Sequence, residues 1–167
     1  LASTSLAQAA TLVLQDVVMT GLSNPRGLVV GPDGAVYVAE AGQGGTAASI
    51  VDGAGETVSL GFSGGISRSK DGVQERVVAR LPSLAPAGGI GATGAHDVAF
   101  SADGTLHAVL GFGGDPTLRA ILPEADLLGQ IIAVTGGTAT AVADLAGYEL
   151  TDNPDGPELN SNPFSLV

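Results

Sequence analysis

A short hairpin pattern occurs twice in this chain of 167 residues and constrains its fold more than any other feature. Residues 21–40 contain two apolar runs on either side of a Pro-Asp-Gly turn at positions 32–34. Residues 96–109 show the same pattern 70 positions later, with Asp103-Gly104 as the turn. Such a turn between two apolar runs predicts a β-hairpin. A recurring hairpin predicts a repeat architecture, which for an all-β chain means a β-propeller or a β-solenoid.

A second hairpin follows each copy of the first. Residues 65–78 have an Asp71-Gly72 turn, and residues 130–142 have a Gly136-Gly137 turn 65 positions later. Asp-Gly and Gly-Gly provide the positive φ angles that two-residue hairpin loops require. Two hairpins per repeat predict an all-β fold whose units are four-stranded antiparallel propeller blades.

These repeats set the expected domain organisation. Blade-like repeats lie near residues 24–81 and 94–145, and a third begins at Ser161, because Ser161–Val167 matches Ser23–Val29 at five of seven positions. Closed propellers contain about 4 to 8 blades. We therefore expect residues 12–167 to form a partial propeller of about two blades with flanking strands. More of the same polypeptide, or other chains, would complete the ring.

The segments outside the hairpins are expected to hold little regular structure. We predict one more strand at residues 12–18 and loops at 41–48, 82–94 and 148–163. Residues 123–128 fit a single helical turn, because a proline and early acidic residues favour a helix start. This is the only helix that the sequence indicates.

Composition supports the all-β prediction and excludes some partners. The chain has 26 Gly and 9 Pro but only 4% aromatic residues, which favours short strands joined by tight turns. Its net charge of −11 repels nucleic-acid phosphates and anionic lipid surfaces. Without cysteine it forms no disulfide or thiolate metal site. Because no apolar run reaches the ~18 residues that a membrane span needs, we expect neither a nucleic-acid partner nor a membrane-spanning segment.

The first residues resemble the end of an export signal. Residues 1–11 are rich in Ala and Ser, and Ala7-Gln8-Ala9 fits a small-x-small cleavage site. We interpret residues 1–11 as a leader or signal-peptide remnant, so the protein is expected to be secreted or periplasmic. The alternative is a flexible leader that directs no export.

Several short motifs in a fixed order carry a resemblance to a known family. They are Asn24-Pro-Arg-Gly-Leu28, Gly31-Pro-Asp-Gly34, Tyr37-Val-Ala-Glu-Ala-Gly42, Gly61-Phe-Ser-Gly-Gly-Ile-Ser-Arg68, Leu81-Pro-Ser-Leu84, Ala95-His-Asp-Val98, Gly111-Phe-Gly-Gly-Asp115, Asn153-Pro-Asp-Gly156 and Ser161-Asn-Pro163. This order resembles the secreted propeller proteins named after the D and E proteins of the cyanobacterial scytonemin gene cluster, the ScyD/ScyE family. The resemblance implies an exported six-bladed propeller, related in shape to NHL-repeat and gluconolactonase-like propellers, with no established biochemical activity. Phe164-Ser165 departs from the pattern, because the first repeat has Arg26-Gly27 there.

Four side chains near the ends of the predicted inner strands are candidates for ligand binding: Arg26, Glu40, His96 and Asp97. Inner strand ends line the axial channel in which propellers hold ligands. A histidine beside an acid can ligate a metal or act as a base. The alternative is structural: His96 caps the preceding loop, Asp97 binds backbone amides, and Arg26 and Glu40 form an ion pair or clamp the backbone.

The segment 152–160 is rich in oxygen donors, and Asp152, Asp155 and Asn160 are candidate metal ligands there. Its spacing lacks the alternating ligands and the closing glutamate of an EF-hand. An Asx-turn loop is therefore the default interpretation and calcium the alternative. No other cofactor is expected.

The sequence contains no nucleophile elbow, phosphate-binding loop or zinc-protease motif, so we assign no catalytic residue. We expect an exported, non-enzymatic β-propeller that acts as an interaction or scaffold unit, an accessory subunit of a larger extracytoplasmic assembly. The alternative is a small-molecule enzyme of the lactonase or quinoprotein sugar-dehydrogenase type with an axial metal or ligand site. Either another protein or the remainder of the propeller is the expected partner, because apolar blade faces need a neighbour.

Overall fold

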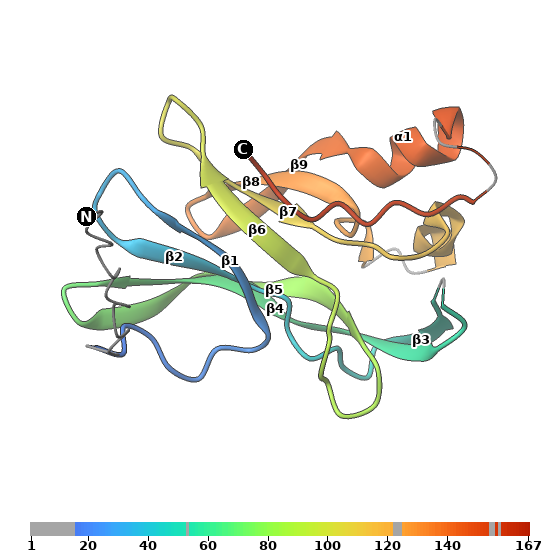
Figure 1. Ribbon diagram of the computed structural model, residues 1–167, viewed down its shortest axis with the longest axis horizontal. Coiled ribbons are helices and arrows are strands. Elements are labelled where there is room, and N and C mark those ends of the chain that lie inside the picture. The colour runs from blue at the N-terminus through green and yellow to red at the C-terminus, as the bar shows by residue number, and fades with distance from the viewer. Residues whose placement is uncertain (1–15, 53, 122–124, 154–155, 157) are drawn as a thin grey trace, which may run out of the picture.

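Two antiparallel β-sheets dominate the computed structural model, which describes residues 16–52, 54–121, 125–153, 156 and 158–167 (Figure 1). In the first sheet, four strands adjoin in chain order: β1 (Pro25–Val30), β2 (Val36–Glu40), β4 (Thr57–Lys70) and β5 (Val73–Ala85). The second sheet has the same arrangement, with β6 (Ala95–Phe100), β7 (Leu106–Leu110), β8 (Gln130–Thr135) and β9 (Thr138–Asp144). The all-β prediction is confirmed.

The predicted hairpins are present at both places. β1 pairs with β2 and β6 pairs with β7, and in each loop a glycine N–H closes the turn, Gly34 onto Gly31 and Gly104 onto Ser101. Gly34 and Gly104 have φ angles of 79° and 84°, a region that glycine enters without strain. The turn residues therefore determine where these hairpins fold.

Several elements differ from the prediction. A short strand, β3 (Ala48–Val51), pairs with the beginning of β4, and β5 extends to Ala85, into the predicted loop 82–94. Residues 16–18, the described part of the predicted strand 12–18, form no strand. Strands replace part of the expected loops here because the beginning of β4 extends beyond β2. It pairs there with β3 on one edge and with β5 on the other.

The helices also lie elsewhere than predicted. Residues 116–121 form the 3₁₀ helix η1 (Pro116–Ile121), and residues 145–152 form α1 (Leu145–Asp152), so the predicted loop 148–163 is wrong for residues 148–152. Asp144 starts α1 by accepting the Gly147 N–H at 2.8 Å. Of the predicted helical turn, residues 123–124 lie outside the described residues, and Ala125–Leu128 forms a turn closed by the Leu128 N–H.

The main core lies between the two sheets. The first sheet contributes Tyr37, Ala39, Ile66, Val78 and Leu81, and the second contributes Val98, Leu106, Ala108, Leu110, Ile132 and Val134. The rings of Tyr37 and Phe100 meet edge to face with their centroids 5.0 Å apart. β1 and β6 lie next to one another in this packing (Figure 1).

The two sheets stack with the same orientation, so that equivalent faces of both sheets point in the same direction. We define two faces for each sheet. The first face of the first sheet carries Leu28, Val30, Val36 and Val38, and positions 70 residues later give the first face of the second sheet: Val98, Phe100, Leu106 and Ala108. The second face of the first sheet carries Val29, Tyr37, Ala39 and Ile66. In the core, the first face of the second sheet packs on the second face of the first sheet.

No helix in the described part of the chain is both long and apolar enough to span a membrane. The longest α-helix there is α1, with 8 residues.

Candidate functional site

Asp97 connects three chain segments at the junction of the two sheets. One of its carboxylate oxygens accepts the Val98 N–H at 2.9 Å, and the other accepts the Leu166 N–H at 2.9 Å. A Cβ atom at position 27 would overlap this carboxylate, so β1 passes Asp97 closely only because Gly27 has no side chain. Asp97 thereby binds backbone amides, in agreement with the structural alternative for this residue.

His96, next to Asp97, is buried and contacts the terminal segment 161–167. Its Nδ1 lies 3.2 Å from the Pro163 carbonyl oxygen, and its ring centroid is 5.0 Å from that of Phe164. Burial lowers the pKa of His96 below its usual value. The Pro163 carbonyl opposes this shift in pKa, and the charge of Arg26 adds to it. The imidazole is therefore neutral near pH 7.

Glu40 is fully buried and accepts three hydrogen bonds. Its Oε1 receives the Ser67 hydroxyl at 2.6 Å, and its Oε2 receives the Ser23 N–H at 2.7 Å and the Arg76 guanidinium at 3.1 Å. A buried carboxylate needs such partners to offset its desolvation. Glu40 thus ties the segment before β1 to β4 and β5.

Arg26 does not pair with Glu40. Its guanidinium donates to the Ala92 carbonyl oxygen at 2.9 Å, which clamps the loop before β6. The structure brings Arg26, His96 and Asp97 together at the junction of β1, β6 and segment 161–167. The Glu40 carboxylate is turned toward Arg76 instead.

The candidate metal ligands do not gather in the described residues. Asp152 is the last residue of α1 and is exposed. Its carboxylate accepts a hydrogen bond from the Thr151 hydroxyl. Asn160 is exposed as well, and Asp155 lies outside the described residues. Within the described ranges, no group of three or more His, Asp or Glu side chains could hold a metal ion.

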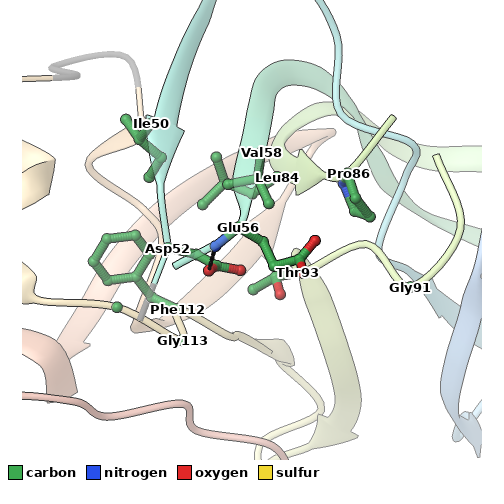
Figure 2. A pocket seen from close by; sticks show the side chains of 11 residues that line it. Ile50, Asp52, Glu56, Val58, Leu84, Pro86, Gly91, Thr93, Phe112 and Gly113 are labelled. Carbon is green, nitrogen blue, oxygen red and sulfur yellow. Dashed lines mark hydrogen bonds between the residues drawn. The ribbon is translucent and has the colours of Figure 1, made fainter. Parts of the chain in front are cut away.

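A pocket of about 150 Å³ lies at the far end of the first sheet, between the β3–β4 hairpin and the loops that follow β5 and β7 (Figure 2). We call it the hairpin pocket. Its lining residues are Ile50, Asp52, Glu56, Val58, Leu84, Pro86, Gly91, Thr93, Phe112, Gly113 and Gly114. Val58, Leu84 and Phe112 are buried and form its apolar floor, whereas Glu56 and Gly91 are exposed and mark its mouth.

Two carboxylates give this pocket its charge. One oxygen of Asp52 accepts the N–H groups of Ala54 at 3.0 Å and Glu56 at 2.8 Å, which holds the β3–β4 turn. Figure 2 shows Asp52 and Glu56 among the side chains that line the pocket, together with Phe112. Among the residues that the structure describes, no Lys or Arg lines the pocket. The hairpin pocket is therefore an apolar space with an acidic mouth.

Sequence reasoning missed this pocket. Its residues come from the β3–β4 hairpin and from the loops after β5 and β7, which lie far apart in the sequence. The available signal was the Asp52 to Gly55 turn, because Asp in an Asx turn followed by a glycine with positive φ indicates a hairpin loop. Gly55 has a φ angle of 81°.

Comparison with protein families, with curated proteins and with solved structures gives no match to this chain. The likeness to the scytonemin-cluster propellers therefore stays a prediction.

Proposed function

We propose that the two sheets are neighbouring blades of a β-propeller and that the protein is an exported, non-enzymatic interaction or scaffold module. The stacking of the sheets supports this proposal. The second sheet has four antiparallel strands in chain order, the first has the same four-strand order with β3 added beside β4, and the second repeats the orientation of the first. Repetition of such sheets about an axis is the construction of a propeller.

The observation that carries the proposed function is the exposure of β1 on the first face of the first sheet, beside the buried Val38 of β2. Leu28 and Val30 on this face are 63% and 64% exposed, and both point away from the second sheet. The matching residues of the second sheet, Val98 and Phe100, pack against the first sheet. Exposed apolar surface of this kind marks an interaction site. Its occupant is another β-sheet that resembles the second face of the first sheet, from the remainder of the propeller or from a partner protein, and in the isolated chain from a second copy.

The predicted site residues also support a scaffold over a catalyst. Glu40, Asp97 and Arg26 are engaged with groups of the protein itself, through backbone and side-chain hydrogen bonds. Such contacts fix the positions of strands relative to one another. Export is proposed from the Ala7-Gln8-Ala9 motif, which lies outside the described residues.

Sedimentation velocity of the 167-residue chain tests this function. We expect the chain to associate as its concentration rises, and the Leu28→Asp/Val30→Asp double variant to remain monomeric, because two carboxylates on the first face oppose burial. Val73→Asp is the matched control, since Val73 is equally exposed, at 66%, beside the β4–β5 turn. A wild-type chain that stays monomeric at every concentration would refute the proposal, as would equal association of the double variant.

A further inference from the structure

The hairpin pocket lies away from the first face and has no part in the proposed scaffold function. We propose that it binds a small organic ammonium ion with an apolar body about the size of a benzene ring. Size, charge and rigidity each support this ligand class.

The volume and lining of the pocket fit a small apolar body. Its floor consists of Val58, Leu84 and Phe112, with Ile50 and Pro86 on its sides (Figure 2). An apolar cavity of roughly the same 150 Å³ accommodates benzene. The body of the ligand therefore has about the size of a benzene ring, and burial of its carbon surface supplies most of the affinity.

The charge of the pocket selects a cation. Asp52 and Glu56 both line it, and the second oxygen of Asp52 has no protein partner among the described residues. The basic side chains of the sequence all lie elsewhere. Three arginines form ion pairs: Arg68 with Asp33 and Glu75, Arg76 with Glu40, and Arg119 with Asp144. Arg26 donates to the Ala92 carbonyl oxygen, Arg80 lies over the Phe62 ring, and Lys70 lies at the opposite end of β4. Carboxylates without a nearby cation, beside a wall of low dielectric constant, attract a positive group and repel an anion.

The walls of the pocket are held in place by backbone contacts. Leu84 and Thr93 exchange two backbone hydrogen bonds of 2.8 and 2.7 Å, which fix the loop after β5 against the strand. Asp52 and Glu56 are linked across the β3–β4 turn by a further backbone bond of 2.9 Å. A pocket formed before the ligand arrives loses less conformational entropy on binding.

Calorimetric titration of the full 167-residue chain with benzylammonium tests the assignment. Benzyl alcohol and benzoate are the matched neutral and anionic probes. We expect benzylammonium to bind, benzyl alcohol to bind about fivefold more weakly because it lacks the charge, and benzoate not to bind. Equal affinity for benzylammonium and benzyl alcohol would overturn the proposed selection of a cation, and so would binding of benzoate.

Substitution of the acidic mouth locates the site. Glu56→Gln should weaken benzylammonium about fivefold and leave benzyl alcohol unchanged. Glu56 is exposed, so this variant is expected to fold as the wild type does. Asp71→Asn is the control, because it removes the same charge at the opposite end of β4, in a turn whose positive φ of 51° asparagine also adopts. An equal effect of both variants would show a general charge effect and contradict the site.

Two further measurements separate this inference from its alternatives. Butylammonium mimics the lysine side chain of a partner protein and fills less of the pocket, so it should bind more weakly than benzylammonium; tighter binding would assign the pocket to a lysine instead. The Leu28→Asp/Val30→Asp variant should bind benzylammonium as the wild type does, because its substitutions lie outside the pocket. The pocket and the scaffold function can therefore fail independently.

Discussion

The first strands of the two sheets have matching positions on the first face but opposite surroundings, whereas the second strands are buried there in both sheets, at Val38 and at Ala108. Val98 on the second sheet is 3% exposed, because the first sheet covers it, whereas Leu28 at the matching place on the first sheet is 63% exposed. Both are aliphatic residues on the first strand of their sheet. The difference therefore comes from the neighbour and not from the residue.

This comparison shows what each contact contributes to the molecule. On the covered face, an apolar side chain stabilises the fold of this chain. On the exposed side of β1, the same kind of side chain contributes to folding only through its own sheet and remains available for association. Matched substitutions at equivalent positions measure this difference directly.

The largest difference is expected at Leu106 and its equivalent, Val36. Leu106 is buried between the sheets, so Leu106→Ala should lower the free energy of unfolding by about 3 kcal/mol. Val36 is half-buried on the first face of the first sheet, and Val36→Ala should cost less than about 1 kcal/mol. Urea denaturation of both variants checks this prediction. Equal losses would show that the two faces are equally covered and would remove the basis of the comparison.

A smaller effect is expected at Glu40, which occupies the place that Leu110 takes in the second sheet. Both positions end the second strand of their sheet and both are fully buried. Glu40→Gln keeps the shape but removes the charge facing Arg76, so we expect a loss of about 2 kcal/mol in the free energy of unfolding. Glu56→Gln is the control and should change this free energy by less than about 0.5 kcal/mol. If Glu40→Gln is as stable as the control, the carboxylate does not hold these strands together.

The smallest effect concerns His96, which stands where the first sheet has Arg26. Because burial lowers the pKa of His96 in the folded state, the unfolded state takes up a proton first as pH falls through about 6.5. Stability from neutral His96 is thus present above pH 6.5 and declines as pH falls toward the lower folded pKa. Asp103 does not contribute in this range, since its pKa is lowered to about 2 by the Ser101 hydroxyl and nearby groups.

Thermal denaturation between pH 7.5 and 5.5 measures this linkage. The midpoint of the wild type should fall with pH, whereas His96→Gln should give a flatter dependence whatever its absolute stability. His107→Gln is the control, because His107 lies on the second face of the second sheet and its Nδ1 contacts the Thr105 carbonyl oxygen instead of that of Pro163. An unchanged slope in His96→Gln would assign the pH dependence to other groups.

The hairpins could be predicted from the sequence because their signals are local. Gly34 and Gly104 follow aspartates in turns between apolar runs, and these residues determine the turn conformation without help from distant contacts. The helix α1 could not be predicted in this way. Its sequence, with Gly147 and Tyr148, has modest helix propensity, and its formation depends on the Asp144 cap and on burial of Ala146 against the second core cluster.

The candidate site could be predicted only in part, for the same reason. Glu40 and His96 were placed near strand ends, which the structure shows. Their partners come from far along the chain: Arg76 is 36 positions from Glu40 and Pro163 is 67 positions from His96. The hairpin pocket depends still more on tertiary contacts, since separate segments form it. A single sequence contains no local signal for contacts between residues so far apart in the chain.

Thiol labelling of Val30→Cys tests the central claim, that the first face of the first sheet is an interface, most directly. The chain lacks cysteine, so this variant has a single thiol, on the exposed side of β1. Ala102→Cys, in the exposed turn after β6, is the control. We predict that maleimide labels position 30 more slowly as protein concentration rises, while position 102 keeps a constant rate. Equal, concentration-independent rates at both positions would contradict the account.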